Sequence, residues 1–317
     1  MSLDLTEDVR LQPLEYRTDR PRILLLANRQ SGRCGARWRK GKVSPLERIR
    51  ICLAGWKVQC EVHQSTSPQD ATQAARQAAL EGYDAVVATG GDGTLRTVAQ
   101  GLVGTHTALG LLPMGTENVL ARSVGIPLDL EGACRHLVRS PVRQMDVGCV
   151  AGQHFLCFAG IGFDAQVVEE VDPQAKEALG SMAYVAAALG AAWKHRDLVP
   201  RARLTVDGRT FEHEFWLILV GNIPLYGGQL RLTPRACPRD GLLDVCVFER
   251  ADALGTLRQW MGAAVGAHAE LPEVAYYLGR EILIETDAPV AVQLDGDPAP
   301  PTPARIQVVP GGVDVRF

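Results

Sequence analysis

Residues 84–94 read Asp-Ala-Val-Val-Ala-Thr-Gly-Gly-Asp-Gly-Thr, an apolar run that ends in a glycine cluster. The run predicts a strand over 84–89 that is buried on both faces. We call residues 90–94 the GGDGT loop; a helix is expected from Gly93 to Val103. Glycines let a ligand approach the backbone closely, and the N–H groups at a helix start form a cradle for phosphate. A plain strand–helix turn is the alternative interpretation.

The pattern around this stretch predicts a two-part α/β protein. Strands alternate with helices through the first part, which favours a parallel sheet covered by helices. The expected strands are 22–28, 57–63, 84–89 and 108–112, and the expected helices are 43–55, 67–80 and 93–103. From Asp146 onward short strands with hairpin signals predict a mainly antiparallel part, with Asp207-Gly208 as a strong turn. These strands are 145–150, 154–161, 203–206, 210–220, 243–248, 282–285, 291–294 and 306–309, with helical stretches at 166–195 and 252–267. We expect domains at 1–145 and 146–317, with the last residues returning to the first domain, and a loop over 297–303.

Composition narrows the functional classes. The 317 residues are 46% hydrophobic and 22% charged, which is ordinary for a globular protein with a sizeable core. The formal charge of −3 gives no overall basic field for nucleic acid. The eight cysteines form no C-x-x-C pair, so a reducing compartment is expected. The longest apolar run, Met182 to Trp193, is too short to span a bilayer, and the N-terminus lacks a signal peptide. We therefore expect a cytoplasmic protein.

Two further polar loops follow predicted strands. Asn28, Ser31 and Gly32 come after the first strand, and Leu-Pro-Met-Gly-Thr-Glu-Asn at 112–118 comes after the strand 108–112. Loops at the carboxyl ends of parallel strands converge on one crevice, where open α/β sheets bind ligands. Asp92 within the GGDGT loop places a carboxylate where phosphates would sit, which makes sense if a divalent cation bridges the two.

These motifs resemble the catalytic domain of the diacylglycerol kinase-type lipid kinases, a family that includes sphingosine kinases and bacterial lipid kinases. The similarity continues at 159–167 (AGIGFDAQV), 221–236 (GNIPLYGGQLRLTPRA), 240–245 (DGLLDV) and 294–298 (LDGDP), so it covers nearly the whole chain. It implies an α/β domain like those of NAD kinase and phosphofructokinase, followed by a β-sandwich. ATP would lie between the two.

The resemblance also implies roles for single residues. The nucleotide contacts would be Asn28, Ser31, Gly32, Gly90, Gly91, Asp92, Gly93, Thr94, Gly115, Thr116 and Asn118. Asp295 matches the general base, which accepts the proton of a lipid hydroxyl during phosphoryl transfer. Asp297 would help Asp92 to hold Mg²⁺ through water. The alternative interpretation of 294–297 is a hairpin turn, because Asp-Gly is a favoured turn pair.

Four other features bear on metal and lipid. Asp240 resembles a residue that binds a second, structural Mg²⁺ in some bacterial members, although a turn into strand 243–248 explains it equally well. Asp164 matches a contact to the lipid headgroup by family position. The basic run 29–50 has two interpretations. It contacts phosphates or an anionic membrane surface, or it is a solvated loop. The apolar stretch 179–193 has three interpretations: it lines a groove for acyl chains, it lies on the bilayer, or it belongs to the core.

The sequence departs from the family pattern at three places. Arg96-Thr97 replaces a common Asn-Glu, Val119 stands where an Asp is common, and Asp297 replaces Glu. The function we expect is an ATP-dependent, Mg²⁺-requiring lipid kinase that meets its substrate at the inner membrane face. An NAD kinase-like enzyme, a non-catalytic nucleotide- or lipid-binding member and a kinase of soluble polyols are the alternatives. A homodimer is left open.

Overall fold

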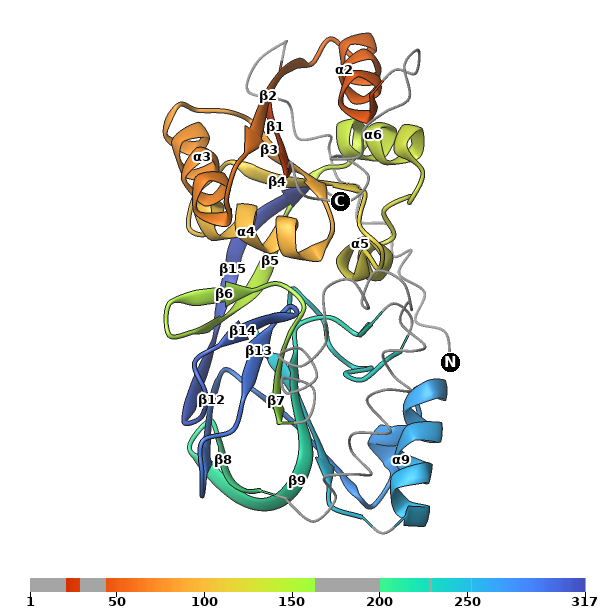
Figure 1. Ribbon diagram of the computed structural model, residues 1–317, viewed down its shortest axis with the longest axis vertical. Helices are drawn as coiled ribbons and strands as arrows, with labels where there is room; N and C mark the ends of the chain where they lie inside the picture. Colours follow the sequence, from red (N-terminus) through yellow and green to blue (C-terminus); the bar gives the residue numbers. More distant parts are fainter. Residues whose placement is uncertain (1–20, 29–43, 163–199, 228–229, 252, 317) are drawn as a thin grey trace.

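The computed structural model describes residues 21–28, 44–162, 200–227, 230–251 and 253–316. Figure 1 shows two lobes stacked along the long axis of the molecule, with the strands β5 and β15 running between them. The first lobe holds a parallel sheet and its helices, and the second holds antiparallel strands. The fold class expected from the sequence is confirmed.

The first lobe is built on four parallel strands in the order β2-β1-β3-β4. They are β1 (Arg22–Asn28), β2 (Gln59–Ser65), β3 (Ala85–Gly90) and β4 (Ala108–Pro113). Every residue of β3 and β4 is buried, as expected of central strands between helical layers. The helices are α2 (Pro45–Gly55), α3 (Pro68–Leu80), α4 (Asp92–Leu102), α5 (Val119–Val124) and α6 (Leu130–Arg139).

The helices begin where the sequence supplies caps. Ser44 accepts the N–H of Glu47 at the start of α2, and Ser67 accepts the N–H of Asp70 at the start of α3. In both helices a proline stands in the first turn, where its missing N–H costs nothing. The strand β2 lies two residues later than predicted, because Lys57 takes a left-handed turn conformation (φ 59°). The helices α5 and α6 were not predicted.

The second lobe consists of two antiparallel sheets that share the long strand β9. Its elements are β5 (Val142–Val150), β6 (Gln153–Phe155), β7 (Phe158–Gly162), β8 (Arg201–Val206), β9 (Arg209–Gly221), β10 (Leu243–Glu249), α9 (Ala253–Val265), a short 3₁₀ turn (His268–Glu270), β11 (Val274–Gly279), β12 (Glu281–Thr286), β13 (Val292–Leu294), β14 (Asp297–Ala299) and β15 (Ala304–Arg316). A buried apolar cluster between the sheets includes Phe155, Phe215 and Ile306.

The strand β15 joins the lobes. Its first half pairs with β12 and β5, and its end pairs in parallel with β4 at Val315 and Leu109. The chain thus returns to the first lobe.

Two predictions for the second lobe need correction. The expected strand 154–161 is split into β6 and β7, because the N–H groups of residues 156–158 are donated to the Asp295 carboxylate instead of to a neighbouring strand. The expected loop 297–303 begins with the short strand β14, and β11 was not predicted. The predicted helix at 252–267 is α9, and the stretch 166–195 lies outside the described residues.

Candidate functional site

The carboxyl ends of the parallel strands bring the predicted loops to one edge. β1 and β3 pair through Ala27 and Thr89, and β3 and β4 pair through Gly90 and Pro113, so the strands end level with one another. Asn28 closes β1 at this edge. The predicted contacts Ser31, Gly32 and Asp164 lie outside the described residues.

The GGDGT loop turns the buried strand β3 into the helix α4. Gly91 is the N-cap in extended conformation (φ −94°, ψ −170°) and makes no side-chain cap. The first N–H groups of a helix have no partner within it and carry partial positive charge. Gly93 in this first turn is exposed, and a Cβ built on it would meet no heavy atom within 4 Å. The donors and the open space fit a phosphate group.

Close packing within the loop explains two more of its residues. A Cβ on Gly90 would lie 2.5 Å from Oγ1 of Thr94, so the Thr94 side chain occupies the space over Gly90. A Cβ on Gly115 would lie 2.4 Å from Cα of Gly91. The GGDGT loop and the loop 114–118 are therefore in backbone contact, which only glycine permits. The N–H of Met114 also donates to the Gly90 carbonyl at 2.9 Å.

Asp92 and Asn118 brace these two loops. The Asp92 carboxylate accepts the N–H groups of Val119 (2.9 Å) and Leu120 (3.1 Å), which caps α5 across the loops. Asn118 has a left-handed backbone (φ 50°), and its amide exchanges two hydrogen bonds with the backbone of Gly115 (3.0 and 2.9 Å). Burial raises the pKa of Asp92 above its usual range, against the effect of the two N–H donors. Both side chains point into the loops.

Asp295 lies at the tip of the β13–β14 hairpin in the second lobe. It has a left-handed backbone (φ 50°) and is followed by Gly296 (φ 87°), the pattern of a type I′ turn. Its carboxylate accepts three backbone N–H groups, from Leu156 (2.7 Å), Cys157 (2.9 Å) and Phe158 (2.9 Å). An ionised carboxylate has about four acceptor positions, so one is left for a further donor. Burial raises the pKa of Asp295 to about 6, although the three N–H groups and Arg96 oppose the shift.

The two lobes bring Asp92 and Asp295 to the same junction. Leu156 and Cys157, whose N–H groups the Asp295 carboxylate accepts, belong to one buried apolar cluster with Leu95 and Val119 of the first lobe. Burial raises the pKa of the Cys157 thiol well above its usual value, and the negative charges of Asp295 and Asp92 add to that effect. The backbone segments that hold Asp92 and Asp295, about two hundred positions apart in the chain, thus pack in one core cluster.

Hydrogen bonds and an ion pair already occupy part of the two carboxylates that the sequence assigned to Mg²⁺. Both oxygens of Asp92 accept backbone N–H groups, and Asp297 pairs with the Arg96 guanidinium at 2.8 Å. Among the residues that the structure describes, no three metal-ligating side chains cluster. The metal roles of Asp92 and Asp297, which the sequence placed through water, stay predictions.

Asp240 has the geometry of a turn residue. It is exposed, and its Oδ1 accepts the N–H of Leu242 at 3.0 Å. The neighbouring Gly241 donates its N–H to Asp146, which also accepts the N–H of Gly311, both at 2.7 Å. Asp146 thereby ties this turn to β15, a role that sequence reasoning missed. The structural Mg²⁺ at Asp240 remains a prediction.

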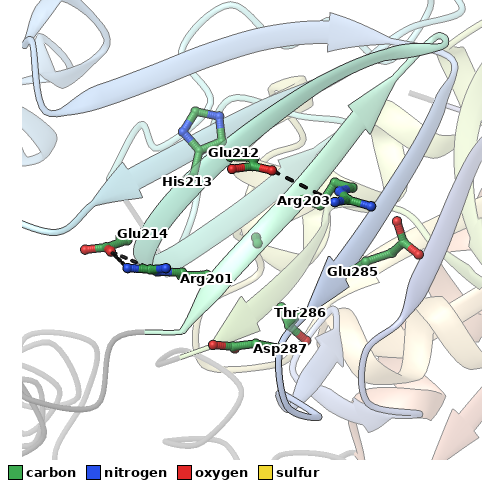
Figure 2. Close-up of a pocket in the computed structure, with 9 residues that line it drawn as sticks. Arg201, Arg203, Glu212, His213, Glu214, Glu285, Thr286 and Asp287 are labelled. Atoms are coloured by element: carbon green, nitrogen blue, oxygen red, sulfur yellow. Dashed lines mark hydrogen bonds and ion pairs between the residues drawn. The ribbon is translucent and has the colours of Figure 1, made fainter.

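Figure 2 shows an open depression of about 570 Å³ on the second lobe, formed by β8, β9 and β12. None of the predicted site residues lines it. Its two arginines are paired within the sheet, Arg201 with Glu214 (3.0 Å) and Arg203 with Glu212 (4.0 Å). These pairs leave no unmatched arginine there to recognise a phosphate.

Sequence reasoning also missed Arg96. It was noted only as a departure from the family pattern, yet it is buried and contacts Asp297 of the other lobe. The available signal was its position on α4, four residues after Asp92.

Comparison with known families agrees with this geometry. The family model described as the diacylglycerol kinase catalytic domain matches residues 22–150, and that of the YegS C-terminal NAD kinase beta sandwich-like domain matches residues 158–317. A parallel lobe with a glycine-rich loop, joined to such a sandwich, defines a class of two-lobed kinases. Within this class the chain belongs to the diacylglycerol kinase family and is YegS-like, as its sequence indicated.

Individual relatives cover most of the chain. A protein of Bacillus subtilis named diacylglycerol kinase is 31% identical over 74% of this chain and 78% of its own length. One of Stenotrophomonas maltophilia named "Probable lipid kinase YegS-like" is 32% identical over 89% and 96%. A crystal structure described as a diacylglycerol kinase from Bacillus anthracis superposes with a TM-score of 0.74 at 25% identity, covering 95% of this chain and 98% of the other.

No helix among the described residues combines the length and the apolar content needed to cross a bilayer.

Proposed function

We propose that this chain transfers the γ-phosphoryl group of ATP to the hydroxyl of a lipid such as diacylglycerol, with Asp295 as general base. The observation that carries the proposal is the lobe junction, where Cys157, which donates its N–H to Asp295, belongs to the same buried apolar cluster as Val119, which donates its N–H to Asp92. Phosphoryl transfer needs a phosphate held in place and an acceptor hydroxyl that loses its proton. In this proposal the first lobe holds the phosphate, and the second lobe supplies the group that accepts the proton.

The first lobe would bind the nucleotide through its backbone. The space beside Gly93 in the first turn of α4 is open, and phosphate oxygens there would accept N–H groups of that turn. Thr116, which is exposed on the adjoining loop, adds a hydroxyl. Asp92 and Asn118 act by bracing the loops. Mg²⁺ in this proposal is carried by the phosphates of the nucleotide, its usual partners.

The second lobe would supply the base. A pKa of about 6 leaves Asp295 ionised at neutral pH and close enough to the working pH to accept a proton. The three backbone donors fix the orientation of the carboxylate while leaving one acceptor position. The lipid hydroxyl would donate its hydrogen bond there and lose its proton to Asp295 as the new phosphorus–oxygen bond forms and the bond to the leaving ADP breaks.

Phosphoryl transfer from labelled ATP tests the proposal. The purified chain is offered detergent-dispersed diacylglycerol, other lipids with free hydroxyl groups, NAD and glycerol in parallel. We expect labelled product with at least one lipid and none with NAD or glycerol. Phosphorylation of NAD alone would make the chain an NAD kinase-like enzyme, and ATP binding without transfer to any acceptor would make it a binding protein.

A further inference from the structure

Arg96 lies on α4, one turn beyond the GGDGT loop, and reaches into the other lobe. It is only 9% exposed. Its guanidinium donates to Oδ2 of Asp297 (2.8 Å) and to the carbonyl of His154 (3.0 Å). A third bond, of 3.1 Å, goes to Oε1 of Gln153. All three partners belong to the second lobe, in β6 and in the β13–β14 hairpin.

Gln100, one turn further along α4, forms hydrogen bonds to the same strand, β6. Its amide nitrogen donates to the His154 carbonyl at 2.6 Å, and its amide oxygen accepts the His154 N–H at 3.2 Å. Residues four apart lie on the same face of a helix, so Arg96 and Gln100 both contact β6 from one face of α4. β6 continues directly into residues 156–158, whose N–H groups hold Asp295.

Two routes therefore connect the GGDGT loop to Asp295. One runs from α4 through Arg96 to Asp297, two residues after Asp295. The other runs from α4 through the His154 backbone to the N–H groups that bind the Asp295 carboxylate. Both begin on the helix whose first turn is the candidate phosphate site.

The charge of this contact affects the metal chemistry. A buried guanidinium cannot lose its proton, so it needs an anion close by. Asp297 supplies that anion, and one of its oxygens is taken up by the guanidinium. A divalent cation bound to the same carboxylate would face the fixed positive charge of Arg96.

We propose that Arg96 and Asp297 form an interlobe ion pair that positions Asp295 against the GGDGT loop and withdraws Asp297 from cation binding. The inference rests on the proposed function, since it assigns Asp295 as the base. Arg96 is a positioning residue, because it contacts Asp297, Gln153 and His154.

The test compares Arg96→Gln, Arg96→Lys, Asp297→Asn and the double variant Arg96→Gln/Asp297→Asn by ATP-dependent transfer to the dispersed lipid. Arg96→Gln is expected to lower kcat about 10- to 100-fold while KM for ATP changes less than about threefold, since no nucleotide contact is removed. Arg96→Lys keeps the positive charge but lacks the planar set of guanidinium N–H donors. Its kcat should therefore lie between those of Arg96→Gln and the unmodified chain. The double variant should be no slower than the slower single variant. Arg201→Gln, which breaks an exposed pair on β8, is the matched control and should leave kcat unchanged. If the losses in kcat of the two single variants multiply in the double variant, the proposed ion pair is wrong.

A Mg²⁺ titration separates the ion pair from a metal site. Asp297→Asn is expected to leave the Mg²⁺ concentration for half-maximal rate within about twofold of the unmodified chain. Removal of a group that supports a bound metal typically costs about 10- to 100-fold in affinity. The inference would be wrong if Asp297→Asn raised the Mg²⁺ concentration for half-maximal rate about 10- to 100-fold and Arg96→Gln did not. Asp297 would then be a metal-binding residue.

Urea unfolding keeps the inference distinct from the proposed function. If the unmodified chain transfers no phosphate to any lipid, the proposed function fails, and the pair is judged by unfolding midpoints alone. Both single variants should lower the midpoint, and the double variant should lower it no further than the larger single change. Additive decreases would show that the two side chains do not act together.

Discussion

Two hairpin turns of this protein share the central residues Asp-Gly and have similar φ angles but different surroundings. Asp207-Gly208 joins β8 to β9 with φ of 46° and 81°, and Asp295-Gly296 joins β13 to β14 with φ of 50° and 87°. Each aspartate also accepts backbone N–H groups from a neighbouring segment, Asp207 from Arg280 and Glu281, and Asp295 from residues 156–158. Local sequence therefore determines the turn in both places.

The surroundings separate the two turns. Asp207 is exposed, whereas Asp295 lies at the lobe junction, where burial raises its pKa to about 6. A perturbed carboxylate near a phosphate-binding loop is a candidate for catalysis, and a solvated one in the same turn is not. The pair thus offers a control that has the same local structure as the candidate base.

The largest expected effect comes from Asp295→Asn compared with Asp207→Asn. Asparagine tolerates the left-handed backbone, so both turns should be retained. Loss of a general base lowers the rate by about 10²- to 10⁴-fold, and we expect this decrease in kcat for Asp295→Asn alone. Steady-state transfer assays measure it, with circular dichroism as the check on folding. Equal activity of the two variants would remove Asp295 from the mechanism.

The pH dependence should show the raised pKa directly. Asp295 accepts a proton only when ionised, and lowering the pH through about 6 protonates it. We therefore expect kcat to be level above pH 7 and to fall about tenfold per unit below pH 6. Asp207→Asn should give the same profile. A profile that stays level down to pH 4.5 would contradict the assignment.

A smaller effect is expected at the phosphate loop. Gly93→Ala places a methyl group in the open space beside the first turn of α4, and alanine is a better helix former. The free energy of unfolding should stay the same or rise by up to about 1 kcal/mol, while KM for ATP should rise about tenfold because the methyl group obstructs the phosphate. Gly55→Ala, at the open end of α2, is the control that should leave KM unchanged.

The smallest effect concerns the turn glycines. Gly208→Ala and Gly296→Ala should each cost about 1–2 kcal/mol in unfolding free energy, because both glycines have positive φ and neither has a neighbour within 4 Å of the added Cβ. Urea unfolding should give equal losses. Only Gly296→Ala should also lower kcat, since it shifts Asp295. A much larger loss at Gly296 would show that the junction constrains that turn beyond its local geometry.

Sequence patterns predicted the first lobe well because its signals are local. Buried strands read as unbroken apolar runs, and Ser44 and Ser67 mark helix starts by side-chain caps. The failures have tertiary causes. The break between β6 and β7 arises because a carboxylate 137 or more positions away takes the backbone donors of residues 156–158. No local pattern indicates such a competitor.

The arrangement of the candidate site was only partly accessible from the sequence. The sequence singled out the GGDGT loop and Asp295, whose roles stay predictions, and the structure packs the backbone that holds Asp92 and Asp295 in one core cluster. It did not show that the side chains of Asp92 and Asn118 brace the loops, nor that Arg96 pairs with Asp297. These contacts join groups that are distant in the chain or depend on the direction of a side chain.

The sequence by itself determined the family, the four parallel strands with α2, α3 and α4 of the first lobe, and the Asp207-Gly208 turn, because periodicity, caps and turn residues act over a few neighbouring positions. Only the tertiary structure decided that the Asp295 turn is half-buried at the lobe junction while the Asp207 turn is exposed. Burial and the partner of a charge depend on what other segments bring to the same place, and that is set by packing of the whole chain.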